Sequence, residues 1–132
     1  MPNLLDGMRI LVLEDELLIA MDVEQLCRDH GAHDIIIVRS LGELQTAPEA
    51  LPDAAIVDVM LGGESTLDFA KDLHARGIPF VFASGYTQSD EIFRDFPGVA
   101  LVGKPYSGDD LMSAVAEACR RVRPSIPSPA TK

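Results

Sequence analysis

At residues 54–59 the chain reads AAIVDV, an apolar run interrupted by one acid, Asp58. Such a run is typical of a parallel strand that is covered on both faces, because neither face then borders water. An acid inside a buried strand is costly unless it is paired or coordinated. The run therefore predicts a buried strand, and it makes Asp58 the first candidate for a functional residue.

Short apolar runs and helical patterns alternate on both sides of this strand. Further strands are expected at residues 8–13, 34–38, 79–83 and 99–102. Helices are expected at residues 16–30, 40–47, 65–76, 88–96 and 108–122. Because strands and helices alternate with short connections, the sequence predicts an α/β fold, a doubly wound five-stranded parallel sheet with helices on both faces.

Local signals mark where some of these elements begin and end. Ser40 is a candidate cap for the short second helix, and Glu43 stands in the capping-box position three residues later. Gly62 and Gly63 are expected to break the chain between the central strand and the helix at 65–76. These signals support the element boundaries given above.

The length of 132 residues fits one domain with one sheet and its covering helices. We expect residues 1–123 to form this domain. Residues 124–132 include three prolines and offer little to bury, so this tail is expected to be disordered. Cys27 and Cys119 have neither metal-ligand spacing nor a thiol neighbour in the sequence, and we expect both to be reduced and structural.

The charge and hydropathy patterns limit the classes of partner. No apolar run approaches the roughly 20 residues that span a membrane, and residues 1–7 lack the pattern of a secretion signal, so a cytoplasmic location without membrane contact is expected. The formal net charge of −10 disfavours direct binding to nucleic acid. The acidic surplus has two interpretations: it promotes solubility, or some of the carboxylates converge on a divalent cation.

Polar residues stand where the predicted strands end. In an open parallel sheet, ligands bind beyond the carboxyl ends of the strands, so we expect these residues to meet in one crevice. They are Glu14, Asp15 and Glu16 after the first strand, Asp58 in the third, Ser84 after the fourth and Lys104 after the fifth.

These residue types suit phosphoryl transfer, in which a protein mainly positions groups and neutralises charge. Asp58 would be the nucleophile, and the neighbouring acids would hold Mg²⁺, which prefers oxygen ligands. Ser84 and Lys104 would contact the transferred group through a hydroxyl and a positive charge.

Each of these residues, taken alone, has a simpler interpretation. Asp15 or Glu16 could cap the following helix, Ser84 forms a common turn pair with Gly85, and Lys104 could be a solvated lysine at a strand end. The functional interpretation depends on the set, because four strand ends each supply a residue type that the same reaction requires.

Residues 8–122 resemble a response-regulator receiver domain of bacterial two-component systems. Glu14 and Asp15 match the metal-binding acids, Asp58 the phosphoacceptor, Ser84 the Ser/Thr beside the phosphoryl group, and Lys104-Pro105 the Lys-Pro dipeptide. The resemblance implies that a sensor histidine kinase or a phosphotransfer protein phosphorylates Asp58 in the presence of Mg²⁺. It also implies a metal contact from the Met60 carbonyl and a cis Lys104–Pro105 bond.

As implied by the resemblance, the chain is a binding module that signals through phosphorylation-dependent contact with an output protein, as a monomer or weak dimer. The resemblance implies no enzymatic activity beyond weak self-phosphorylation and autodephosphorylation. A phosphohydrolase is disfavoured because Met60 stands where such enzymes have a second acid. A flavodoxin-like cofactor site lacks its Gly-rich loop after the first strand. A pseudo-receiver that is never phosphorylated is the third alternative.

One departure from the family pattern concerns signal transmission. Receivers commonly have Tyr or Phe three residues before the lysine as partner of the Ser/Thr, and this chain has Leu101 there. The segment at residues 80–86, FVFASGY, resembles a receiver subfamily with an F-A-[ST]-G-Y motif, in which many members are stand-alone domains. We therefore expect Phe82 or Tyr86 to act with Ser84 in the switch.

Overall fold

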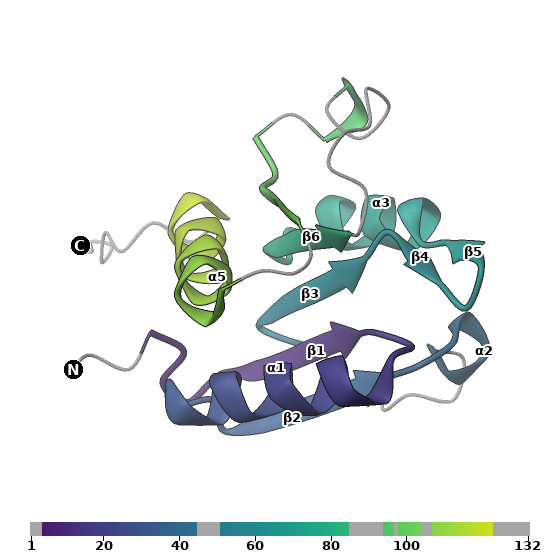
Figure 1. Ribbon diagram of the computed structural model, residues 1–132. Helices are drawn as coiled ribbons and strands as arrows, with labels where there is room; N and C mark the ends of the chain where they lie inside the picture. The colour runs from purple at the N-terminus through teal and green to yellow at the C-terminus, as the bar shows by residue number, and fades with distance from the viewer. Residues whose placement is uncertain (1–3, 45–50, 85–93, 97, 104–106, 123–132) are drawn as a thin grey trace.

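The computed structural model describes residues 4–44, 51–84, 94–96, 98–103 and 107–122 of the chain. Its centre is a five-stranded sheet with the strand order β2-β1-β3-β6-β7 (Figure 1). All neighbouring strands run parallel. The strands are β1 (Arg9–Leu13), β2 (Asp34–Val38), β3 (Ala54–Asp58), β6 (Phe80–Ser84) and β7 (Leu101–Gly103).

The strand register brings the carboxyl ends of the strands to one edge of the sheet. Leu13, the last residue of β1, pairs with Val38 of β2 and with Val57 of β3. Asp58, the last residue of β3, pairs with Ala83 of β6. The residues that follow β1 and those that end β3 and β6 are therefore neighbours, although they lie far apart in the sequence.

Helices cover both faces of the sheet. The structure contains α1 (Leu17–Asp29), α2 (Leu41–Leu44), α3 (Leu67–Ala75) and α5 (Gly108–Val122). Figure 1 shows α1 and α5 on one side of the sheet and α3 on the other. This is the doubly wound α/β architecture that the alternation of elements predicts.

The alternation of side chains along each strand divides the apolar interior into two cores. One core lies under α1 and α5, where one set of sheet residues packs against the apolar faces of the two helices. The sheet residues include Ile10, Val12, Ile56 and Val81, and the helix residues include Val23 and Cys27 of α1 and Leu111 and Val115 of α5. Full burial of each such aliphatic side chain contributes about 1.5–3 kcal/mol. The two helices are thus held to the sheet by the residues that repeat at helical spacing.

The core under α3 takes the other set of sheet residues, including Leu11, Leu13, Val57 and Phe82, and packs them against Ala70 and Leu73. Three phenylalanines meet within it edge to face. The ring centroids of Phe82 and Phe96 lie 5.2 Å apart, and those of Phe80 and Phe96 lie 5.9 Å apart. This aromatic cluster attaches the segment before β7 to the sheet.

The expected strands are confirmed to within two residues at either end, and the helix expected at 108–122 is found with those bounds. The expected helix at 65–76 starts at Leu67 instead, because Ser65 belongs to a small antiparallel hairpin of β4 (Met60–Leu61) and β5 (Glu64–Ser65). Gly62 and Gly63 form its turn with φ of 60° and 84°, a conformation that favours glycine. The sequence indicated a break here but not a hairpin.

One half of the capping box at the second helix is present, and the other half is shifted by one residue. The Glu43 N–H donates to the Ser40 hydroxyl at 3.3 Å, and the Glu43 carboxylate accepts from the Arg39 N–H at 2.8 Å. Of the helix expected at 88–96, Arg94 and Asp95 are helical, and the preceding residues lie outside the described part of the chain. The expected disordered tail at 124–132 also lies outside it.

Both cysteines are buried, as expected for structural residues. Burial raises the pKa of the Cys27 thiol from 9.0 to about 12. Within the described residues, none of the helices combines the length and the apolar character that crossing a membrane would require.

Candidate functional site

Three carboxylates meet at the carboxyl edge of the sheet. One oxygen each from Glu14, Asp15 and Asp58 lies within 4.8 Å of the others. Glu14 and Asp58 are 3% and 7% exposed, whereas Asp15 is half-buried. The sheet register explains the cluster, because the residues after β1 lie beside the end of β3.

Asp58 is held through both its side chain and its main chain. Its carboxylate oxygen Oδ1 accepts a hydrogen bond from the Met60 N–H at 3.3 Å. Its main-chain carbonyl accepts from the Thr66 hydroxyl at 2.6 Å. The next residue, Val59, donates its N–H to the Ala83 carbonyl at 3.1 Å, which continues the ladder to β6 beyond the last strand residue.

The two acids after β1 are also held by main-chain donors. The Asp15 carboxylate accepts from the Gly62 N–H at 2.9 Å, so the β4–β5 hairpin reaches across to the end of β1. The Glu14 carboxylate accepts from the Glu16 N–H at 3.0 Å. Glu16 occupies the N-cap position of α1, and its side chain makes no cap hydrogen bond. Helix capping therefore does not account for Asp15 or Glu16.

The donor set fits a hard divalent cation. Three carboxylates so close together repel one another, and a cation between them would offset this repulsion. Carboxylate oxygens are ligands that Mg²⁺ and Ca²⁺ prefer in proteins. Within the described residues, the chain thus offers an oxygen-only cluster of suitable chemistry at the edge where ligands bind to parallel sheets.

No family model matches the chain. A curated relative, the transcriptional regulatory protein PdtaR of Mycobacterium tuberculosis, is 34% identical over 122 residues, which cover 87% of this chain and 58% of PdtaR. The crystal structure of the response regulator PhyR from Brucella abortus superposes with a TM-score of 0.72 and 27% identity, over 89% of this chain and 50% of that one. The chain belongs to the response-regulator receiver family.

A third comparison supports the fold of the receiver domain. The CheY-like receiver domain protein of Methanospirillum hungatei superposes with a TM-score of 0.75 at 21% identity, over 89% of this chain and 97% of that one. The chain spans about half the length of the curated relatives it matches. The part that this chain shares with these relatives is therefore the receiver domain. The activities of the longer proteins are not carried over to this chain.

Of the other residues that match the receiver pattern, the structure describes the backbone of Ser84. Ser84 is the last residue of β6 and pairs with Gly103 of β7, one position beyond the pair of Asp58 and Ala83. Its backbone thus lies at the same edge of the sheet as the acids. Lys104 follows Gly103 directly, but Lys104, Pro105 and Tyr86 lie outside the described residues. The cis Lys104–Pro105 bond remains a prediction for this reason.

Phe82, a candidate switch residue, and Leu101, at the position where receivers commonly have the aromatic partner, lie on adjacent strands. Phe82 pairs with Leu101 in the sheet. Phe82 is fully buried in the core under α3, and its ring contacts Phe80 and Phe96. Leu101 is partly buried against the same core. A movement of Phe82 would therefore have to be shared with the other two rings.

Thr66 is a site residue that the sequence analysis missed. It is fully buried, and its hydroxyl contacts the carbonyls of Asp58 and Val59. In the sequence, a Thr before a helical pattern indicates a cap, and nothing indicates that its hydroxyl faces a strand eight residues earlier. The direction of this hydroxyl depends on the hairpin, which was not predicted either.

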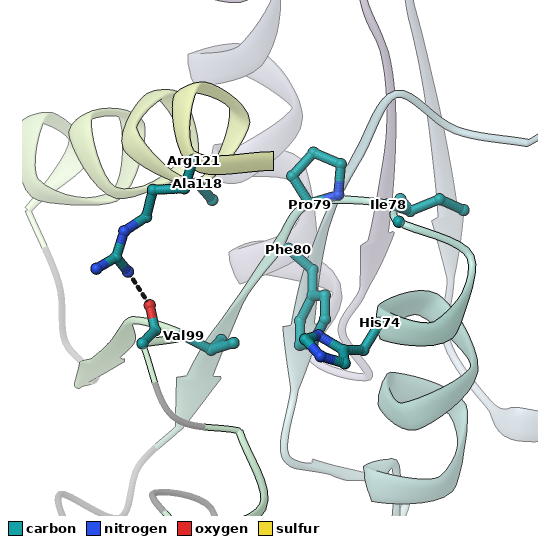
Figure 2. A pocket seen from close by; sticks show the side chains of 9 residues that line it. His74, Ile78, Pro79, Phe80, Val99, Ala118 and Arg121 are labelled. Atoms are coloured by element: carbon teal, nitrogen blue, oxygen red, sulfur yellow. Dashed lines mark hydrogen bonds between the residues drawn. The ribbon is translucent and has the colours of Figure 1, made fainter. Parts of the chain in front are cut away.

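A cleft of about 440 Å³ lies elsewhere on the receiver domain, away from the acids. It opens between the end of α3, the start of β6 and the last turns of α5 (Figure 2). Its lining is mainly apolar, and the Arg121 guanidinium at its rim donates to the Gly98 carbonyl. Phe80 precedes Ala83, the neighbour of Asp58, by three residues along β6, a separation of about 10 Å.

Proposed function

We propose that this receiver domain accepts a phosphoryl group on Asp58 and that phosphorylation changes which protein it binds. The observation that supports the proposal is the cluster of Glu14, Asp15 and Asp58, with carboxylate oxygens within 4.8 Å of one another. A cluster of acids at the carboxyl edge of a parallel sheet matches the arrangement that this reaction needs.

The reaction is a phosphoryl transfer between nitrogen and oxygen. An Asp58 carboxylate oxygen attacks the phosphorus of a phosphohistidine on a sensor kinase or phosphotransfer protein. The new P–O bond forms an acyl phosphate, the P–N bond breaks, and the released imidazole nitrogen keeps the electron pair and takes up a proton.

Glu14, Asp15 and Asp58, together with the Met60 carbonyl that the family resemblance adds, would hold the Mg²⁺ ion. Bound Mg²⁺ supplies positive charge that offsets the repulsion between the carboxylates and the incoming phosphoryl group. By the same resemblance, Ser84 and Lys104 contact the phosphoryl oxygens, and Phe82 or Tyr86 moves with Ser84 in the switch.

The chain acts as a phosphoacceptor rather than as a hydrolase in this proposal. Met60 follows the nucleophile by two positions, and a thioether is a weak acceptor that cannot act as a general base. The output is contact with another protein. PhyR of Bartonella quintana, a solved structure similar to this chain, is an anti-anti-sigma factor, and regulatory proteins are therefore a class of partner to test.

Labelling with acetyl phosphate and MgCl₂, followed by peptide mass mapping, tests the proposal. The parent should gain one acid-labile phosphoryl group on Asp58. Asp58→Asn should remain folded, because an amide oxygen can still accept from the Met60 N–H, but it should not be labelled. Asp68→Asn, which alters an exposed acid of α3, is the matched control and should be labelled like the parent. Undiminished labelling of Asp58→Asn would refute the assignment.

A further inference from the structure

Thr66 occupies the N-cap position of α3 but does not cap the helix. Its side chain makes no cap hydrogen bond. The hydroxyl contacts two main-chain oxygens at the end of β3, the Asp58 carbonyl at 2.6 Å and the Val59 carbonyl at 3.0 Å. Thr66 is fully buried, so water does not compete for these contacts.

Because the Thr66 side chain points to the strand, α3 lacks the stabilisation that a capping hydroxyl usually provides. A Thr that caps a helix contributes about 1 kcal/mol by accepting from an N–H of the first turn. In α3 the Ser65 hydroxyl accepts from the Leu67 N–H at 3.2 Å, while the Thr66 hydroxyl is directed at the strand. The Thr66 hydroxyl therefore forms hydrogen bonds with the end of β3 and none with the first turn of α3.

The contacts of Thr66 fix the peptide unit that reaches the Asp58 carboxylate. Both the N–H and the hydroxyl of Thr66 lie at 3.0 Å from the Val59 carbonyl. The same peptide unit carries the Met60 N–H, which donates to Asp58 Oδ1 at 3.3 Å. Because a peptide unit is planar, holding its carbonyl also sets the direction of its N–H.

The second contact acts on Asp58 itself. The Thr66 hydroxyl at the Asp58 carbonyl restrains the main chain from which the Asp58 side chain departs. One hydroxyl proton is thus placed between two consecutive carbonyls, one belonging to Asp58 and one to the peptide that donates to its carboxylate. The Thr66 side chain therefore restrains the Asp58 carboxylate in two ways, through the main chain of Asp58 and through the peptide unit whose N–H donates to the carboxylate.

We propose that Thr66 is a positioning residue, which orients the Asp58 carboxylate for phosphoryl acceptance through the Val59–Met60 peptide unit. The inference rests on the proposed function of Asp58. Small displacements of reacting groups reduce rates strongly, by up to about a hundredfold for 1 Å. We expect loss of the hydroxyl to slow labelling of Asp58 by about tenfold, because the restraint is lost but the carboxylate remains.

Three variants separate positioning from general stability. Thr66→Val keeps the shape and removes the hydroxyl, Thr66→Ser keeps the hydroxyl, and Thr66→Cys keeps the size with a weaker donor. With acetyl phosphate and saturating MgCl₂, well below each midpoint of unfolding, labelling should be slow for Val, intermediate for Cys and close to the parent for Ser. Leu73→Val, a core change two turns along the same helix, is the control for lost stability and should be labelled at the parent rate.

A second measurement needs neither metal nor phosphodonor. Amide hydrogen exchange of Met60, followed by NMR in the presence of chelator, should be faster in Thr66→Val than in Leu73→Val if the peptide unit has lost its restraint. The inference is overturned if Thr66→Val matches the parent in both labelling rate and Met60 exchange. If Thr66→Val does not fold, parent-like values in Thr66→Cys overturn it. Failure of the parent to be labelled would refute the proposed function instead, and the exchange measurement would still test the positioning.

Discussion

Met60 is the residue beside Asp58 that bears on the lifetime of the phosphorylated state. Its side chain is 39% exposed at the start of the hairpin, and its N–H points at the Asp58 carboxylate. An exposed thioether offers an attacking water no strong hydrogen-bond partner. Met60 thus borders the site without supplying the group that would speed loss of an acyl phosphate.

We predict that Met60→Asn shortens the lifetime of the acyl phosphate by about tenfold, which corresponds to roughly 1.4 kcal/mol of barrier. The amide would hold the attacking water. Pulse labelling with acetyl phosphate, removal of the donor and timed sampling give the decay rate. Met60→Leu, which adds no polar group, is the control and should decay like the parent. Equal decay of all three proteins would show that this position does not set the lifetime.

Cys27 makes a pH-dependent contribution to stability. Burial raises the pKa of its thiol from 9.0 to about 12 in the folded protein, so in the unfolded chain the thiol ionises at lower pH. Its contribution is therefore complete below about pH 9 and is lost as the pH rises towards 12.

We predict that the stability advantage of the parent over Cys27→Ala shrinks above pH 9, by up to about 1 kcal/mol per pH unit. Urea unfolding of both proteins at pH 8 and pH 10.5 gives the difference. Other groups titrate in this range, and the comparison between the two proteins cancels their effect. A difference that does not change with pH would contradict the assigned cause.

The acids of the site could be read from the sequence because each stands where an apolar strand ends, and parallel strands share one carboxyl edge. The contacts of Thr66 and of the Gly62 N–H could not. They depend on where the chain goes after Asp58, and a hairpin of two residues in each strand leaves too short a pattern to recognise.

Among the contacts between elements, the packing of Phe96 attaches the segment before β7 to the sheet. It is 1% exposed and lies against Phe80 and Phe82. Aromatic pairs in this edge-to-face geometry add to the stability that burial alone provides. Among the described residues before β7, Phe96 is thus a fully buried link to the core under α3, and the partly buried Val99 packs against the same core.

We predict that Phe96→Ala lowers the free energy of unfolding by about 3–5 kcal/mol, the usual cost of removing a buried phenylalanine. Phe69→Ala, at a partly buried ring of α3, should cost clearly less. Urea unfolding followed by circular dichroism measures both. Equal losses would contradict the larger stabilising role assigned to the buried Phe96.

Strands and long helices were predictable because burial imposes a period on their sequences, as α5 shows with bounds that match the expectation. The hairpin β4–β5 and the start of α3 were not, since Gly62 and Gly63 signal a turn without stating what the flanking residues pair with. The sequence therefore located the break after Asp58 but not the structure within it.

The three clustered carboxylates are part of a chain whose formal net charge is −10, and folding brings them close together. The mutual repulsion of Glu14, Asp15 and Asp58 works against stability, and a bound cation offsets it. The stability of the domain should therefore respond to divalent cations more than to ionic strength.

We predict that MgCl₂ raises the midpoint of thermal unfolding above that in NaCl of equal ionic strength, since an ion that binds only the folded state at 100 times its Kd adds about 2.7 kcal/mol. Asp15→Asn should unfold at a higher temperature than the parent in chelator, because repulsion is relieved, and should gain much less from MgCl₂. Asp68→Asn is the control and should respond like the parent. Equal responses of all three proteins would place the cation elsewhere.

The strand order β2-β1-β3-β6-β7 also has a consequence for biosynthesis. Once β1 and β2 have left the ribosome, each later strand joins an open edge: β3 adds beside β1, β6 beside β3, and β7 beside β6. No strand has to be inserted between two that are already paired. The chain leaves the ribosome N-terminus first, so this sheet can be extended strand by strand as the chain emerges, and Asp58 can reach its neighbours Glu14 and Asp15 before β6 has left the ribosome.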